Sequence, residues 1–297
     1  MIRTACVTGG AGFIGSHLVG RLLAEGTEVV VLDDFSSGLR EHVPPSVRLV
    51  EGSVLDDAAI DEATAGCDLV FHLASRVSVP ESMAHPDLYH EVTALGTRRV
   101  LESALRMGAT RLVLASSCSV YGDAPVPVAE DVARSPMSPY AQAKADAEDF
   151  CRGFASERFA TIAARFFNVY GPGQRADSPY SGVIAKFLQA RSEGTTPIVF
   201  GDGLQSRDFV FVGDVVNALI LAAGSTAPGD GSPFNVGTGQ AVSILDLLEA
   251  IGCAPADFQP ARQGDILHSR ADTTRTAEAI GFRAEVSLSE GIRELIG

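Results

Sequence analysis

The sequence lacks an apolar run long enough to cross a membrane, and it lacks any cluster of Lys and Arg. A spanning helix needs about 18 consecutive apolar residues, and no segment reaches that length. There are 23 Lys and Arg and 37 Asp and Glu, so the formal charge is 23 − 37 = −14. Because nucleic acids and anionic membranes attract basic surfaces, we expect neither as a partner. An anionic substrate therefore needs a few local Arg residues.

Cysteine is scarce and widely spaced, and no C-x-x-C pair occurs. An odd number of scattered cysteines is typical of free thiols in a reducing compartment, not of a disulfide framework or a structural zinc site. No apolar leader precedes the first expected strand. We therefore expect a cytoplasmic protein without a metal site. The five cysteines are Cys6, Cys67, Cys118, Cys151 and Cys253.

Short β-branched runs alternate with longer helical patterns in the first half of the chain. This alternation predicts a parallel sheet with right-handed crossovers. The expected fold is α/β, a Rossmann-type doubly wound parallel sheet. The expected helices are Ile14–Glu25, Leu88–Met107 and Tyr140–Glu157. The expected strands are Thr4–Thr8, Glu28–Leu32, Val47–Glu51, Leu69–Leu73, Arg111–Ala115 and Thr161–Ala164.

The pattern loosens after about residue 165, where turns such as Gly171-Pro172-Gly173 interrupt it. We predict a large domain over residues 1–165, with a returning segment near 208–236. A smaller C-terminal α/β domain is predicted over residues 166–297, with a cleft between the two. Its expected elements are Phe209–Val212, Val215–Ala223, Asn235–Gly237, Ser243–Ile251 and Ser289–Leu295.

Three glycines separate the first expected strand from the first expected helix. Gly9, Gly12 and Gly15 form a G-x-x-G-x-x-G pattern. The first glycine permits a tight turn, the second lets a diphosphate approach the backbone, and the third allows close helix–sheet contact. The helix N-terminus offers free N–H groups to phosphates. This context predicts a dinucleotide-binding site in the domain of residues 1–165.

An acidic residue at the end of the second strand indicates which dinucleotide is bound. Asp33 lies 18 residues after Gly15, a spacing typical of the carboxylate that binds the adenosine ribose hydroxyls. A carboxylate there repels a 2′-phosphate, so NAD is favoured over NADP. Arg40 is the nearest cation downstream and leaves NADP open as the alternative.

Tyr140 and Lys144 stand four residues apart, on one face of an expected helix. A tyrosine of ordinary pKa, about 10, acts as a base near neutral pH only if positive charge stabilises its phenolate. An adjacent ammonium and an oxidised nicotinamide supply that charge. Ser117 follows the strand Arg111–Ala115, at the sheet edge where ligands bind. The three residues predict a catalytic group.

Together these motifs resemble those of the extended short-chain dehydrogenases/reductases. The resemblance is to the NAD-dependent nucleotide-sugar epimerase/dehydratase family, closest to the UDP-glucose 4-epimerase-like enzymes, and it covers essentially the whole chain. It rests on the segments Thr8–Gly15, His72–Ser75, Ser116–Gly122, Tyr140–Lys144, Arg165–Pro172, Arg207–Val210, Gly264-Asp265 and Ala271-Asp272.

The resemblance implies a reaction and roles for the catalytic group. Tyr140 is expected to take the proton of the sugar 4-hydroxyl, Lys144 to bind the nicotinamide ribose and lower the tyrosine pKa, and Ser117 to share the hydroxyl hydrogen bond. NAD accepts a hydride from C4 and returns it to the other face of a 4-keto intermediate. The implied activity is that of an isomerase, a UDP-hexose 4-epimerase with bound NAD.

The resemblance also implies which residues contact each ligand. Asn168, Arg207 and Arg262 are expected at the diphosphate of the substrate, and Asp265 at its ribose. The cofactor contacts are Gly9, Gly12, Phe13, Ile14, Gly15, Asp33, Asp34, Ser53, Val54, Leu73, Ala74, Ser75, Tyr140 and Lys144. The substrate contacts are Ser117, Cys118, Ser119, Asn168, Arg175, Val183, Arg207, Arg262, Asp265 and Ser269.

Several positions depart from the family pattern. Ser53 stands where an adenine-binding acid is usual, Thr93 where an asparagine is usual, and Phe166 where a polar residue is usual. Dehydratases of the family place an Asp-Glu pair after the Ser/Thr that matches Ser117, where this chain has Cys118 and Ser119. The missing acid pair argues for epimerisation and against dehydration.

Two positions bear on the sugar. A small residue at Ser269 resembles epimerases that admit N-acetylhexosamines, and Arg175 resembles the arginine that faces the sugar carboxylate in UDP-glucuronate epimerases, although a solvent-facing arginine is equally expected there. The following segment, Pro179–Ile184, looks more like the neutral-sugar enzymes. UDP-glucose/UDP-galactose is the first expectation. UDP-glucuronate or UDP-N-acetylglucosamine 4-epimerase is the alternative, and a reductase, dehydratase or decarboxylase is a weaker one.

The resemblance also implies a homodimer with a four-helix interface. The helices Leu88–Met107 and Tyr140–Glu157 are expected to supply it. Their apolar residues fit either that interface or the core. These residues are Val92, Leu95, Val100, Leu101, Phe150 and Phe154.

Overall fold

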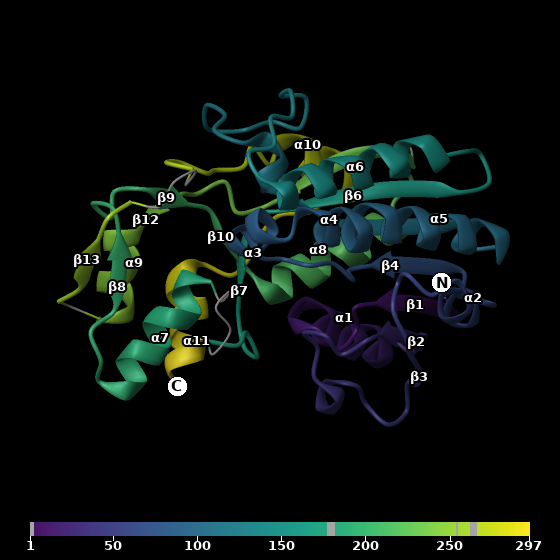
Figure 1. Ribbon diagram of the computed structural model, residues 1–297, viewed down its shortest axis with the longest axis horizontal. Coiled ribbons are helices and arrows are strands. Elements are labelled where there is room, and N and C mark those ends of the chain that lie inside the picture. Colours follow the sequence, from purple (N-terminus) through teal and green to yellow (C-terminus); the bar gives the residue numbers. More distant parts are fainter. Residues whose placement is uncertain (1–2, 177–181, 228, 254, 262–265) are drawn as a thin grey trace.

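A sheet of seven parallel strands forms the centre of the computed structural model (Figure 1), which describes residues 3–176, 182–227, 229–253, 255–261 and 266–297. The strand order is β11-β6-β5-β4-β1-β2-β3, and every neighbouring pair is parallel. The predicted Rossmann-type doubly wound fold is confirmed. The strands are β1 (Thr4–Thr8), β2 (Glu28–Asp33), β3 (Arg48–Glu51), β4 (Leu69–His72), β5 (Arg111–Ser117), β6 (Ala160–Phe166) and β11 (Asp230–Val236).

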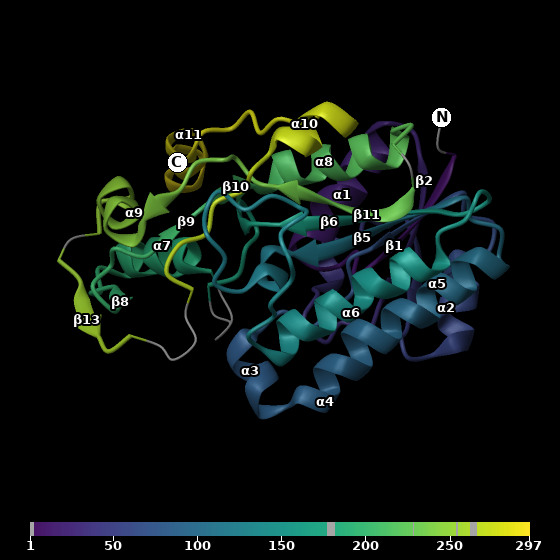
Figure 2. The same ribbon diagram turned by 90° about the horizontal axis from the view of Figure 1, so that it is seen from above.

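Helices cover both faces of this sheet (Figure 2). One face packs against α1 (Phe13–Ala24) and α8 (Val212–Gly224), and the other against α2 (Asp57–Thr64), α5 (Gly96–Arg106) and α6 (Pro139–Phe154). Because both faces are covered, a central strand such as β1 carries nearly continuous apolar residues and is buried along most of its length.

The strand order reverses between β1 and β4, and this reversal positions the functional site. The chain proceeds from β1 to β2 and β3 on one side of the sheet, and then from β4 to β5 and β6 on the other. The two sets of connections diverge at the carboxyl ends of β1 and β4. Open α/β sheets bind ligands in the crevice that this divergence leaves.

The remaining elements form a smaller region at the end of the sheet, drawn on the left of Figure 1. It has its own core, which includes Phe187, Leu247 and Ile251. Its helices are α7 (Val183–Glu193), α9 (Ile244–Ile251) and α11 (Leu288–Ile296). Its paired strands are β7 (Asn168–Tyr170) with β10 (Phe209–Phe211), β9 (Ser206–Arg207) with β12 (Val242–Ser243), and β8 (Ile198–Phe200) with β13 (Asp257–Gln259).

One expected helix differs from the structure. Residues 88–107 are not a uniform α-helix, because the turn His90–Leu95 is π-helical and lies between α4 (Pro86–Tyr89) and α5. π-Helical turns are rare and frequently occur at functional sites. Here Thr97 hydrogen-bonds His72 at the end of β4, and Thr93 hydrogen-bonds Ser75, which follows that strand. A short helix, α3 (Val79–Ala84), precedes α4.

Some elements have no counterpart among the expectations from sequence. They include α2, α3, α7, β7, β8, β9, β12, β13 and α10 (Thr274–Ile280), which are short or amphipathic. β13 is exposed along its whole length, so it lacks the alternation of buried and exposed residues that indicates a strand. Its pairing with β8 depends on the tertiary arrangement of the smaller region.

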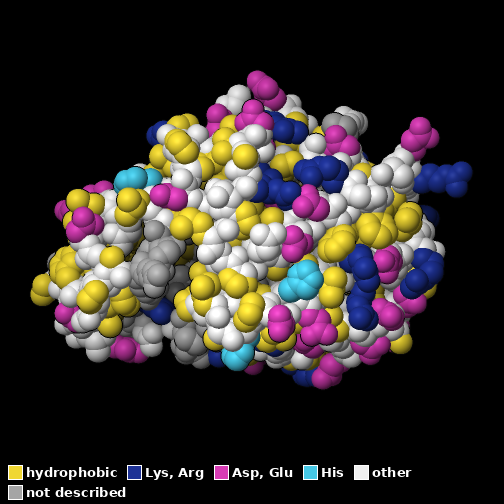
Figure 3. Space-filling model, turned by 45° about the horizontal axis from the view of Figure 1, so that its top comes forward, with side chains coloured by type: hydrophobic (Ala, Val, Ile, Leu, Met, Phe, Trp, Pro, Cys, Tyr) yellow, Lys and Arg dark blue, Asp and Glu magenta, His cyan; other side chains and the backbone are white. Residues whose placement is uncertain are grey.

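The described helices include none that is long and apolar enough to span a bilayer. On the face drawn in Figure 3, Lys and Arg side chains are interspersed with Asp and Glu. The five cysteines are free thiols.

The junction between α11 and β7 generates a stability prediction. A Cβ atom at Gly291 would lie 2.2 Å from the hydroxyl of Tyr170, and that ring is buried with its edge against Phe211. We expect Gly291→Ala to lower the free energy of unfolding by about 1–3 kcal/mol through overpacking. Chemical denaturation measures the change.

Gly20→Ala is the matched control. Gly20 lies within α1, and a Cβ there meets nothing within 4 Å. We expect that variant to gain about 0.5–1 kcal/mol from helix propensity. Equal effects at Gly291 and Gly20 would contradict the proposed packing of α11 on Tyr170.

Candidate active site

A cavity of about 500 Å³ opens at the carboxyl edge of the seven-stranded sheet. It runs from the glycine loop and the end of β2 to Tyr140, Lys144 and the beginning of the smaller region. Most of the expected cofactor residues line it, namely Gly9, Gly12, Phe13, Ile14, Gly15, Asp33, Asp34, Val54, Leu73, Ala74, Ser75, Tyr140 and Lys144. Of the expected substrate residues, its lining includes Asn168, Arg175 and Val183.

The glycine loop is tightly packed at Gly9 and Gly15 but open at Gly12. Gly9 has a φ of +71°, and a Cβ at Gly15 would lie 2.1 Å from the carbonyl oxygen of Gly9. Neither position accepts a side chain. Gly12 begins α1 without a side-chain cap, and a Cβ there meets no atom within 4 Å except the Gly9 oxygen. The N–H groups of the first turn of α1 are therefore available to phosphate oxygens.

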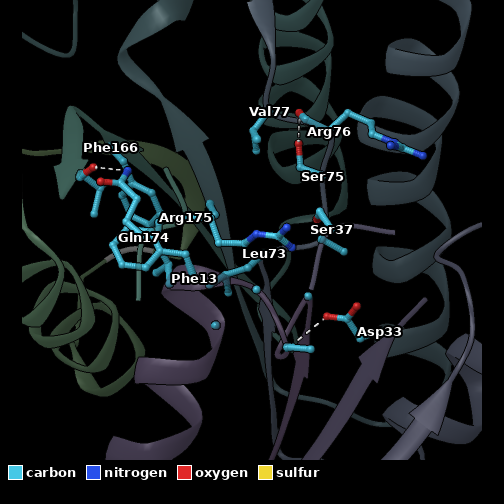
Figure 4. Close-up of a pocket in the computed structure, with 18 of the residues that line it drawn as sticks. Phe13, Asp33, Ser37, Leu73, Ser75, Arg76, Val77, Phe166, Gln174 and Arg175 are labelled. Atoms are coloured by element: carbon cyan, nitrogen blue, oxygen red, sulfur yellow. Dashed lines mark hydrogen bonds between the residues drawn. The ribbon is translucent and has the colours of Figure 1, made fainter. Parts of the chain in front are cut away.

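Asp33 holds the glycine loop against the end of β2. Its Oδ2 accepts from the Ala11 N–H and its Oδ1 from the Phe35 N–H, both at 2.9 Å; the first bond is drawn in Figure 4. Burial raises the pKa of this carboxyl group, and the two N–H donors oppose that shift. Arg40, the alternative partner for a 2′-phosphate, forms an ion pair with Glu51 and stacks on the Phe35 ring.

The structure shows where three of the residues that depart from the family pattern lie. Thr93 hydrogen-bonds Ser75 Oγ at 3.1 Å, so its hydroxyl supports the cavity wall. Ser53 lies outside the cavity lining, and its hydroxyl accepts from the Leu55 N–H at 3.2 Å. The contact of Ser53 with adenine stays a prediction. Phe166 lines the cavity with its ring.

A buried histidine fixes the end of β4 beside the site. His72 Nε2 donates to Thr97 Oγ1 at 3.0 Å, because that hydroxyl itself donates to the Thr93 carbonyl. His72 Nδ1 therefore accepts from Thr8 Oγ1 at 2.6 Å, which in turn accepts from the Ala74 N–H. Burial and the nearby Lys144 lower the pKa of His72 to about 3. The ring is neutral and structural.

The catalytic group lies where β5 ends and α6 begins. Ser138 caps α6 by accepting from the Ala141 N–H, and Tyr140 and Lys144 then occupy successive turns. Ser117 ends β5, and its hydroxyl hydrogen-bonds Tyr140. The Lys144 ammonium donates to the Ala115 carbonyl oxygen at 2.7 Å. The structure thus brings the three expected residues together.

Burial opposes the charged form of both ionisable members of this group. It raises the pKa of Tyr140 to about 12, against the Ser117 hydrogen bond. It lowers the pKa of Lys144 to about 8, against the attraction of Glu148. A Tyr140 phenolate therefore needs further positive charge. An oxidised nicotinamide supplies such charge when bound.

Glu148 extends the face of α6 that carries Tyr140 and Lys144, and the sequence motifs give no indication of its role. Its carboxylate is 1% exposed. It accepts two hydrogen bonds from Arg165, at 2.8 and 2.7 Å, and one from Ser116 Oγ at 2.5 Å. Arg165 also stacks over the Tyr121 ring. This buried pair joins α6 to both β5 and β6.

Small polar side chains lie beyond Ser117. Cys118 Sγ and Ser269 Oγ are 4.0 Å apart, and burial raises the pKa of the thiol to about 11, so it stays protonated. The Ser119 hydroxyl is buried without a hydrogen-bond partner among the described residues. A buried hydroxyl without a partner is costly, so this position suits a polar ligand or water.

The expected diphosphate residues are only partly described. Asn168 Nδ2 donates to the Asp208 carbonyl. Arg207 donates to the carbonyls of Ser206 and Leu267 and lies close enough to Cys118 to lower its thiol pKa. Arg262 and Asp265 lie outside the described residues.

Several lining residues escape prediction from the sequence. Ser36 and Ser37 follow Asp33 in a turn that presses on the glycine loop, since a Cβ at Gly38 would lie 2.8 Å from the Ala11 Cβ. Small residues directly after the acidic strand end are the signal that indicates such a turn. Other lining residues of this kind include His42, Arg76, Val77 and Gln174.

Comparison with known proteins identifies the family. Residues 5–237 match the model of the NAD dependent epimerase/dehydratase family. The chain belongs to this family. Its cofactor is NAD, and the glycine loop, Asp33 and Lys144 are the groups of this epimerase/dehydratase that fit it.

Individual relatives align over the full length of this NAD-dependent epimerase/dehydratase. The UDP-glucose 4-epimerase of Mycolicibacterium smegmatis is 40% identical, over 98% of this chain and 96% of its own. The Thermotoga maritima UDP-glucose 4-epimerase with UDP-glucose has a TM-score of 0.93 at 34% identity, covering 99% and 97%. MoeE5 with UDP-glucuronic acid and NAD has a TM-score of 0.89 at 36% identity, covering 98% and 97%. Decarboxylases and a dehydratase also occur among the relatives.

Lys144 generates a pH prediction for the nucleotide-free protein. Its ammonium pKa is 10.5 in ordinary surroundings and about 8 in the fold. Between these values the unfolded chain binds a proton that the folded chain has lost, so stability rises with pH. We expect the unfolding free energy of the wild type, minus that of Lys144→Met, to rise by about 3 kcal/mol from pH 8 to 10.5.

Denaturant titrations of both proteins across this pH range measure the difference. Other titrating groups are common to both chains and cancel. A difference that is flat, or that falls as pH rises, would contradict the depressed pKa of Lys144.

Proposed function

We propose that the chain is a UDP-hexose 4-epimerase that interconverts UDP-glucose and UDP-galactose and retains its NAD. The observation that carries the proposal is the grouping of Ser117, Tyr140 and Lys144 beside Cys118 and Ser119 in place of two acids. The first three residues serve oxidation and reduction at one carbon. The next two supply no carboxylate for elimination.

The proton leaves the sugar 4-hydroxyl toward Tyr140. Ser117 hydrogen-bonds Tyr140 and is placed to accept or donate at the same hydroxyl. Lys144 holds positive charge one helical turn away and lowers the cost of the phenolate. NAD⁺, which the glycine loop, Asp33 and Lys144 would hold, would supply the acceptor and later the donor of the C4 hydride. Inversion follows when the 4-keto sugar presents its other face to the nicotinamide.

Dehydration and decarboxylation need more from the site than these residues offer. Asp208 is a carboxylate whose charge helps to raise the pKa of the Cys118 thiol. It accepts four hydrogen bonds, from Thr238 N–H and Oγ1, Gly239 N–H and Ala271 N–H, at 2.7–3.1 Å. A fully engaged structural carboxylate does not shuttle protons.

The choice of sugar rests on two residues. Ser269 and Cys118 are both small, and Ser269 Oγ lies 4.0 Å from Cys118 Sγ; two small residues there support UDP-N-acetylglucosamine as a second substrate. Arg175 lines the cavity that also contains Tyr140 and Lys144. That it faces the carboxylate of UDP-glucuronate stays a prediction.

A homodimer through α5 and α6 is part of the proposal. Val100 and Leu101 are fully buried and belong to the core. Leu95, in the π-helical turn directly before α5, and Phe150 and Phe154 of α6 are half-buried, which leaves apolar surface on these two helical segments for a second copy. We also propose a cytoplasmic location, because free cysteine thiols are typical of a reducing compartment.

The test of function is a panel of UDP-glucose, UDP-N-acetylglucosamine and UDP-glucuronate, with products identified by NMR. We expect inversion at C4, fastest with UDP-glucose, with no net change in reduced-nicotinamide absorbance. Release of carbon dioxide from UDP-glucuronate or formation of a deoxy-keto sugar would instead assign the chain to the decarboxylases or dehydratases.

Tyr140→Phe tests the mechanism. We expect turnover to fall by about 10³-fold, because the proton acceptor is gone, while bound NAD is retained. Tyr121→Phe is the matched control, since its hydroxyl bonds Asn235 outside the cavity lining, and turnover should stay within a few-fold. Wild-type turnover in Tyr140→Phe would remove this residue as the base.

A further inference from the structure

The segment Gly171–Arg175 lies across the cavity from the glycine loop. Gly173, Gln174 and Arg175 line the same cavity as Gly9–Gly15. Figure 4 shows the Arg175 side chain extending from this segment into the cavity, with its guanidinium directed toward the wall that carries Leu73 and Ser37. That wall belongs to the cofactor end of the cavity.

Two contacts hold this segment in place. His17 lies on α1, and its Nε2 donates to the Pro172 carbonyl oxygen at 2.8 Å, with its ring against Phe13. Gln174 Nε2 donates to the Val169 carbonyl at 3.2 Å, the bond drawn beside Phe166 in Figure 4. The first contact ties the segment to the helix whose N-terminus faces the phosphate site.

The charge of the cofactor needs a cation that the glycine loop does not supply. The diphosphate of NAD carries two negative charges, and the chain has a net charge of −14. Three Lys or Arg residues occur in the described cavity lining, Arg76, Lys144 and Arg175. Lys144 donates to the Ala115 carbonyl, and Arg76 points away from the cavity in Figure 4.

We propose that Arg175 binds the diphosphate of NAD, and that the segment Gly171–Arg175, anchored on α1 by His17, closes over the resident cofactor. A guanidinium presents two parallel N–H donors that match two phosphate oxygens. A cofactor that returns its hydride within each turnover has to stay bound until the hydride has been returned. This segment supplies the retention, whichever sugar is the substrate.

The test measures NAD binding without any nucleotide sugar, so it is independent of the epimerase reaction. The dissociation constant and the release rate of NAD are compared for the wild type, Arg175→Ala, Arg175→Lys and the control Arg76→Ala, at low and high salt. We expect Arg175→Ala to weaken NAD binding by about tenfold or more at low salt and to flatten the salt dependence. The dissociation constant of NAD for Arg175→Lys should lie between those of the wild type and Arg175→Ala. That for Arg76→Ala should lie within twofold of the wild type.

His17→Ala tests the anchor. We expect it to weaken NAD binding in the same direction, and the double variant His17→Ala/Arg175→Ala to lose less than the sum, because one residue acts through the other. Thermal melting checks that each variant is folded.

Three outcomes overturn the proposal. If Arg175→Ala binds NAD within twofold of the wild type at every salt concentration, Arg175 does not contact the diphosphate, and a raised KM for UDP-glucuronate alone then assigns it to the sugar. If Arg76→Ala loses as much NAD affinity as Arg175→Ala, the effect is one of general charge. If the losses of NAD affinity in His17→Ala and Arg175→Ala are strictly additive, His17 does not anchor the segment.

Discussion

The buried carboxylate of Glu148 is the point at which the catalytic helix is attached to the sheet. Three groups from β5, β6 and the loop before α6 converge on it, namely Ser116, Arg165 and Arg134. A buried charge is tolerated only when it is paired and hydrogen-bonded, so these partners hold the rotation and depth of α6. Lys144 and Tyr140 lie one and two turns away on the same face, and their positions follow from this attachment.

The electrostatics of the site follow from the same burial. The protein interior drives Tyr140 and Lys144 toward their neutral forms, and the Glu148 carboxylate acts against that tendency at Lys144. The protonation of Tyr140 and Lys144 therefore depends on any positive charge that a bound ligand brings. A site tuned in this way keeps the phenol protonated on its own, and a bound oxidised nicotinamide would lower the phenol pKa so that the phenolate forms closer to neutral pH.

Much of the architecture could be predicted from local sequence, for identifiable reasons. The strands of the central sheet are apolar on both faces, and Gly9 and Gly15 stand where the chain has no room for a Cβ. The spacing of four residues between Tyr140 and Lys144 predicts that both lie on one face of a helix. Contacts between distant segments carry no such local signal. The pairing of Glu148 with Arg165, the neutral His72 between Thr8 and Thr97, and the π-helical turn at His90–Leu95 depend on how separate elements pack. β13 is exposed and short, so its strand exists through its neighbour β8.

After it has entered the smaller region, the chain returns to the central sheet, and this topology limits how the protein could be divided or recombined. β11 pairs with β6, and α8 covers one face of the strands, although both come after the first elements of the smaller region. A fragment ending after β6 would leave an unpaired hydrogen-bonding edge and a bare apolar face, the two features that promote association between chains. The smaller region therefore cannot be removed as a single C-terminal block, because α8 and β11 would be lost with it. An exchange of that block between relatives brings a new β11 and a new α8, which have to fit the β6 edge and the sheet face that remain.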